Sequence, residues 1–165
     1  MLAIVKAFWQ IALFRRGPED LPDSQPLLLL ACAVYMLVDI FVILALYPSE
    51  ALVPLLLADV GFLALWSAAV LHLFKFAARL QRTLTALYGV GALLQVLASP
   101  LTLSSAGIPM NLQIAGSLII LLWSVAVYGH IYSRALTRPL GIGLMFSIIY
   151  FIVIYKFAAQ WSQVN

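Results

Sequence analysis

The chain has 165 residues, of which 65% are hydrophobic and only 9% are charged, and its mean hydropathy is +1.09. Soluble domains are about 45–50% apolar and about 25% charged, so this composition excludes an ordinary soluble domain and predicts an integral membrane protein. The net charge of +3 does not indicate nucleic-acid binding, because the few basic residues are scattered at the ends of apolar runs.

Residues 1–14 predict an amphipathic helix that lies on the cytoplasmic surface of the membrane. Lys6 and Gln10 are one turn apart and share a polar face. The opposite face is apolar and carries Leu2, Val5, Trp9, Ala12 and Leu13. This pattern is typical of an interfacial helix, with a frayed tail as the alternative. No small-residue cleavage site follows, so a signal peptide is not predicted.

The segment "RRGPEDLPDSQP" (15–26) completes a predicted cytoplasmic region over residues 1–25. Its three prolines and one glycine break any helix. One interpretation is a simple hinge, and the other is a docking motif for a partner protein, since prolines lower the entropy lost on binding. The candidate docking residues are Arg15, Arg16, Glu19, Asp20 and Asp23.

Residues 26–165 predict a transmembrane domain of five helices. The apolar segments that are long enough to span a bilayer are 26–47, 51–74, 84–103, 112–132 and 140–161. They lack the alternation of a β-barrel. The predicted fold class is therefore all-α, a polytopic membrane protein with five transmembrane helices plus the N-terminal interfacial helix.

The basic residues predict the orientation of the five spans. Eight of the nine lysines and arginines lie before the first span, between the second and third, or between the fourth and fifth. Because positive residues favour the cytoplasmic side, we expect the N-terminus inside and the C-terminus outside. Lys156 is the exception.

Two aspartates lie inside predicted spans. Asp39 and Asp59 are each eight residues from the outer end of their helix, or roughly 12 Å deep. Their neighbours in this predicted polar layer are Gln95, Gln113, Ser117 and Lys156. The aspartates could form a structural polar tie, a proton or cation site, or a contact with a partner's transmembrane helix. Lys156 either extends to the interface or pairs with an aspartate.

No catalytic motif, metal cluster or nucleotide loop is recognisable, so we expect a protein that is not an enzyme and binds no cofactor or metal. The aspartates lack the flanking signature of an intramembrane protease. His72 and His130 lie near the cytoplasmic face without a carboxylate at their level, which makes a poor metal site. They are the only candidates for lipid-directed catalysis, the least favoured hypothesis. Cys32 is interpreted as a packing residue.

Five spans, an amphipathic N-terminal segment and the proline-rich lead "RRGPEDLPDSQP" resemble the Yip1 family of membrane proteins. The resemblance covers the architecture of nearly the whole chain and implies a non-enzymatic adaptor or accessory subunit. Its expected partners are the lipid bilayer and other integral membrane proteins or a second copy, with no nucleic acid, and its expected location is the bacterial inner membrane. The alternative is a small transporter or ion-pathway subunit that uses Asp39 and Asp59.

Overall fold

The computed structural model describes residues 2–103 and 109–161, and every regular element in these ranges is helical. The elements in chain order are α1 (Leu2–Ala12), η1 (Pro18–Asp20), α2 (Gln25–Leu46), η2 (Ser49–Ala51), α3 (Leu52–Leu56), η3 (Leu57–Gly61), α4 (Phe62–Leu73), η4 (Ala77–Arg79), α5 (Leu80–Leu103), α6 (Met110–Leu136) and α7 (Leu140–Trp161).

Within the described residues, five helical segments are long and apolar enough to cross a membrane, which confirms the predicted all-α, polytopic fold class. The second of them is composite and joins η2, α3, η3 and α4. The helices differ from the predicted spans at their ends, since α5 begins at Leu80 and α6 extends from Met110 to Leu136. Hydropathy marks only the apolar core, whereas backbone hydrogen bonding continues through the polar turns at the interface.

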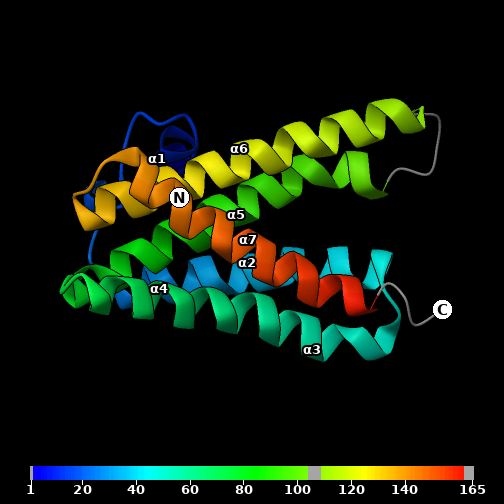
Figure 1. Cartoon of the computed structure of the whole chain (residues 1–165), viewed down its shortest axis with the longest axis horizontal. Helices are drawn as coiled ribbons and strands as arrows, with labels where there is room; N and C mark the ends of the chain where they lie inside the picture. Colours follow the sequence, from blue (N-terminus) through cyan, green and yellow to red (C-terminus); the bar gives the residue numbers. More distant parts are fainter. Residues whose placement is uncertain (1, 104–108, 162–165) are drawn as a thin grey trace.

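The contacts between the five spans close into a ring, and Figure 1 shows these helices lying lengthwise beside one another. Helix α2 packs against α3 and α5, α5 packs against α6, and α6 packs against α7. The ring closes where α7 contacts α4 and η3. Residues 83–92 of α5 are all buried, because α1, α2, α4 and α6 surround this helix. Such an arrangement can hold polar side chains in its interior, away from lipid.

Helices α6 and α7 approach each other most closely at two glycines. A Cβ atom added to Gly143 would overlap the carbonyl oxygen of Gly129 and would lie 2.6 Å from the backbone nitrogen of Ser133. One turn further along α7, the Ser147 hydroxyl donates to the Val125 carbonyl at 2.7 Å. Small residues allow this kind of backbone contact between membrane helices.

Helix α1 is seen nearly end-on in Figure 1, so it crosses the direction of the long helices and does not run along them. Its buried stripe contains Ala7, Phe8, Ile11 and Ala12. The Phe8 ring packs against Gly89 of α5, and Trp123 Nε1 of α6 donates to the Ala12 carbonyl at 3.0 Å. Of the residues in the predicted apolar face, Val5, Trp9 and Leu13 are exposed as an interfacial helix requires, whereas Ala12 is buried against the bundle. The helix has two apolar stripes, and the prediction considered only one.

Candidate functional site

Asp59 lies on a π-helical turn in the middle of the second span. This turn, η3, interrupts the α-helical geometry between α3 and α4. The Tyr88 hydroxyl of α5 donates to the Val60 carbonyl of the turn at 2.9 Å. A neighbouring helix thus supplies a hydrogen bond to backbone that the widened turn exposes, as irregular backbone in a membrane requires. Turns of this kind are frequent at functional sites.

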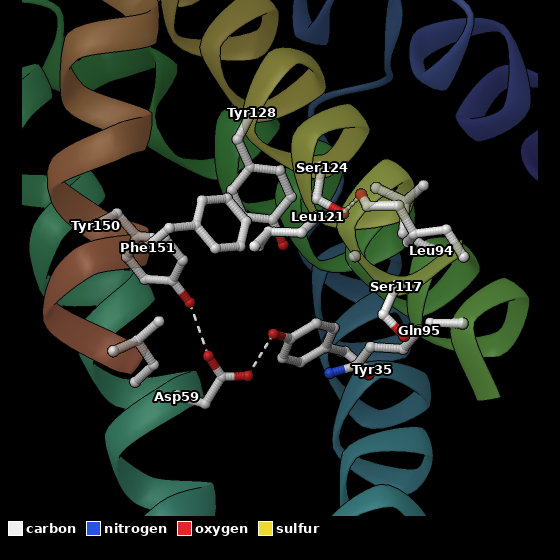
Figure 2. Close-up of a pocket in the computed structure, with 14 residues that line it drawn as sticks. Tyr35, Asp59, Leu94, Gln95, Ser117, Leu121, Ser124, Tyr128, Tyr150 and Phe151 are labelled. Carbon is white, nitrogen blue, oxygen red and sulfur yellow. Dashed lines mark hydrogen bonds between the residues drawn. The ribbon is translucent and has the colours of Figure 1, made fainter. Parts of the chain in front are cut away.

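Both carboxylate oxygens of Asp59 accept hydrogen bonds from tyrosines (Figure 2). The Tyr35 hydroxyl of α2 donates to Oδ2, and the Tyr150 hydroxyl of α7 donates to Oδ1 at 2.7 Å. Three helices of the ring therefore converge on one carboxylate. Hydrogen bonds to a charged acceptor are stronger than those between neutral groups, so the two tyrosines offset part of the cost of burying a charge on Asp59.

Ring packing fixes the two tyrosines. Tyr150 stacks on Phe62 with ring centroids 5.7 Å apart and on Tyr128 with centroids 5.9 Å apart. Tyr35 packs on Tyr88 with centroids 5.4 Å apart. Gly91 of α5 makes room for this cluster, because a Cβ there would lie 2.5 Å from the Tyr128 hydroxyl oxygen and 2.6 Å from the Tyr35 ring. The two tyrosines that donate to Asp59 are thus held in place by packing.

A cavity of about 260 Å³ adjoins Asp59 in the interior of the ring (Figure 2). Side chains from α2, η3, α5, α6 and α7 line it. Its polar lining consists of Tyr35, Asp59, Gln95, Ser117, Ser124, Tyr128 and Tyr150. Three residues of the predicted polar layer, Asp59, Gln95 and Ser117, are therefore brought together here.

Asp39 lies next to this cavity and points into the bundle. Its side chain is only 5% exposed, and Gln95 Nε2 donates to its Oδ1 at 3.2 Å. The other oxygens of the pair, Asp39 Oδ2 and Gln95 Oε1, are buried and have no hydrogen-bond partner in the described part of the chain. The structure thus gives no support to the interpretation in which Asp39 faces a partner's helix.

The remaining members of the predicted layer lie elsewhere. Lys156 is exposed on α7, and neither aspartate forms an ion pair within residues 2–103 and 109–161. The alternative in which Lys156 pairs with Asp39 or Asp59 is therefore wrong for this structure. Gln113 is half-buried on α6 and does not line the cavity.

Two of the three acids predicted to dock a partner form ion pairs with arginines of the chain's own bundle. Glu19 of the 15–26 segment forms an ion pair with Arg134, and Asp23 forms one with Arg82 at 3.6 Å. Asp20 accepts a hydrogen bond from the Gly17 backbone at 3.0 Å. This segment is thus a defined structure rather than a loose hinge.

The two arginines at the start of the segment remain accessible. Arg15 and Arg16 have exposed side chains, and the Arg16 carbonyl contacts His130 Nε2 at 3.0 Å. The second histidine, His72, is exposed on α4. Among the described residues, no group of three or more His, Cys, Asp or Glu side chains could hold a metal ion.

Sequence reasoning missed the tyrosines of the site. Tyr35 precedes Asp39 by four residues, so both lie on one face of α2, and this spacing was a usable signal. Tyr150 lies 91 residues after Asp59, and no pattern in its own span distinguishes it. The π-helical turn also has no signature in the apolar sequence "LADVG" (57–61).

Comparisons with protein-family models, with curated proteins and with solved structures find no match to this chain. Its function must therefore be argued from the geometry of its own residues.

Proposed function

We propose that this protein is a small transporter or ion-pathway subunit that binds a proton or a small monovalent cation at Asp59, inside the membrane. The observation that carries the proposal is a cavity beside a carboxylate on a π-helical turn, with a wall that is mostly apolar but contains several polar side chains. Asp39 is a second acidic group near the cavity, because Gln95, which lines the cavity, donates a hydrogen bond to it.

The charges of the interior support cation binding. Asp39 and Asp59 lie in the spans, and no described lysine, arginine or histidine pairs with either. An unpaired charge is costly inside a membrane, and acids at such depth mark ion and proton pathways. The tyrosine donors reduce this cost for Asp59 but bring no positive charge. A bound proton or cation would supply the missing positive charge.

The orphaned oxygens of Asp39 and Gln95 support the same conclusion. Buried polar atoms normally have a hydrogen-bond partner, and an exception calls for an explanation. Two acceptor oxygens without a donor are satisfied by a proton on the carboxyl group or by a cation between them. Gln95 also lines the cavity, so it connects Asp39 to the space beside Asp59.

The size of the cavity agrees with a small ligand. A volume of about 260 Å³ is enough for several water molecules or one small cation. The aromatic rings of Tyr35, Tyr128, Tyr150 and Phe151 contribute to the lining, and such rings attract cations through their faces. A purely structural tie between helices requires no such space.

The test is cation entry into liposomes that contain the purified protein. A potassium gradient with valinomycin makes the interior negative, and dyes inside report protons and sodium separately. We expect faster entry of one ion than in protein-free liposomes. Asp59→Asn should reduce the rate at least tenfold, because the amide keeps the size of the side chain but removes its charge.

The matched control is Glu50→Gln, which removes an exposed carboxylate on η2, outside the cavity. This variant should transport like the parent protein. Equal rates in the parent protein and in protein-free liposomes would refute the proposal, and so would an unchanged rate in a correctly folded Asp59→Asn protein.

A second candidate function is a non-enzymatic adaptor or accessory subunit of the Yip1 type in a bacterial inner membrane. The observation that favours it is an apolar groove of about 250 Å³ between α1, α2 and α5. Its wall includes the exposed apolar side chains of Val5, Leu30 and Val34, which can contact a partner's helix. A photo-crosslinker at Val34, in this groove, should capture one specific membrane protein. Capture of lipid alone would contradict this function.

A further inference from the structure

We propose that the basic end of the bundle contains a binding site for a phosphate group, separate from the cavity at Asp59. The site is a pocket of about 600 Å³ between the 15–26 segment, the start of α5 and the connection from α6 to α7. Four arginines line it, namely Arg79, Arg82, Arg134 and Arg138. We call it the arginine pocket.

The arginine pocket has more positive than negative charge. Glu19 pairs with Arg134, and Asp23 pairs with Arg82. Within the described residues, Arg79 and Arg138 have no carboxylate partner. Two guanidinium groups are therefore left for an anion from outside the chain.

Arg79 is held in position by uncharged partners. Its Nη1 donates to the Ala135 carbonyl and to the Thr137 hydroxyl, both at 2.8 Å, and its guanidinium lies 4.4 Å from the centre of the Phe76 ring. Thr137 ends α6 with φ of 53°, in the left-handed region that β-branched residues rarely adopt. This backbone conformation is costly. It places the Thr137 hydroxyl where it accepts from Arg79, which fixes that arginine at the edge of the pocket.

The other arginines add donors around the same space. Arg138 lies over the Phe74 ring at 5.8 Å, and the ring leaves its N–H groups free to turn toward the pocket. Arg82 Nε is buried and has no hydrogen-bond partner in the described part of the chain. Because this atom is covered by the chain, an anion with several acceptor oxygens would be bound by the terminal nitrogens of the guanidinium groups.

Phosphate is the anion that this chemistry favours. Guanidinium groups bind phosphate through paired N–H donors. The pocket lies at helix ends on the predicted cytoplasmic side, where basic pockets between membrane helices meet anionic lipid headgroups. The phosphate can belong to such a headgroup or to a soluble molecule. In either case Glu19 competes with it for Arg134.

The experiment measures binding to the full-length protein in dodecyl maltoside by native mass spectrometry. The probes are dioctanoyl phosphatidic acid, inorganic phosphate, and dioctanoyl phosphatidylcholine as a lipid without net charge. We expect phosphatidic acid or inorganic phosphate to bind better than phosphatidylcholine. Preference for phosphatidic acid identifies a lipid headgroup, and preference for inorganic phosphate identifies a soluble ligand.

Two variants test the residues. Arg138→Gln should weaken binding about tenfold, the usual effect of one lost charge-assisted hydrogen bond. Arg138 is exposed, and its guanidinium lies at the surface, 5.8 Å from the centre of the Phe74 ring, so this variant should fold. Glu19→Gln should strengthen binding severalfold, because it removes the competing carboxylate.

The control is the double variant Arg15→Gln and Arg16→Gln. It removes two positive charges, whereas Arg138→Gln removes one, and both of its positions are exposed and lie outside the pocket. Equal weakening by the control and by Arg138→Gln would show only non-specific attraction and would overturn the proposal. So would equal binding of phosphatidic acid and phosphatidylcholine together with no binding of inorganic phosphate.

Discussion

Replacing Gly143 with Ala should separate α6 from α7 and disturb the site at Asp59. The added Cβ would meet backbone atoms of α6, including the Gly129 carbonyl oxygen and the Ser133 nitrogen. Backbone atoms cannot rotate away as a side chain does. The two helices must therefore move apart, on the order of 1 Å, to restore ordinary van der Waals separation.

The size of the effect follows from overpacking. An extra methyl group in a tightly packed interior costs about 1–3 kcal/mol. For a chain of this length that corresponds to a fall in Tm of roughly 2–12 °C. The displacement also reaches the site, because Gly143, Ser147 and Tyr150 lie on one face of α7. The bonds from Ser147 to Val125 and from Tyr150 to Asp59, both 2.7 Å, should lengthen.

The assay is thermal unfolding in dodecyl maltoside, followed by tryptophan fluorescence, together with ion entry into liposomes. Gly141→Ala is the matched control, because a Cβ at Gly141 would meet nothing within 4 Å. Both variants make the same chemical change on the same helix, and they differ only in what the new methyl group contacts. We expect Gly141→Ala to have the Tm and the transport rate of the parent protein or slightly higher stability.

Equal Tm values for the two variants would refute the reasoning about α6 and α7. A lower Tm for Gly143→Ala with an unchanged transport rate would refute the coupling between this helix contact and Asp59.

Two further predictions concern single hydrogen bonds. Tyr35→Phe and Tyr150→Phe each remove one donor to Asp59 and should lower the free energy of unfolding by about 0.5–2 kcal/mol. The loss should be smaller in an Asp59→Asn background, and a double-mutant cycle without coupling energy would contradict the contact. Trp123→Phe removes the bond to the Ala12 carbonyl and should loosen α1. Trypsin should then cleave faster after the arginines that follow α1, and an unchanged rate would show that the bond does not hold this helix.

The number and length of the spans could be predicted because a bilayer requires apolar segments of about 20 residues. Depth could be read as well, since helical rise is constant. This is why Asp39 and Gln95 were placed in one layer, and the structure brings them into contact. Both inferences use distance along a helix axis, which the sequence contains directly.

The direction in which each side chain points could not be read from the spans. An apolar helix presents no polar face to orient it, so the rotation of Asp59 toward Tyr150 depends on contacts between distant segments. The same holds for Lys156, whose place near a helix end allowed two directions. The ion pairs of Glu19 and Asp23 could not be predicted, because their partners Arg134 and Arg82 lie on helices far along the sequence.

The π-helical turn η3 accommodates one extra residue in the second span. Leu55 before the turn and Leu63 after it are eight residues apart, and both are buried in the bundle. Eight residues of a regular α-helix would leave these two side chains about 80° apart around the helix axis. Deleting one residue between Leu57 and Gly61 would leave seven, which is close to two full α-helical turns, so both leucines would still face the bundle. The shortened span should therefore keep its packing and lose only the widened turn that presents Asp59.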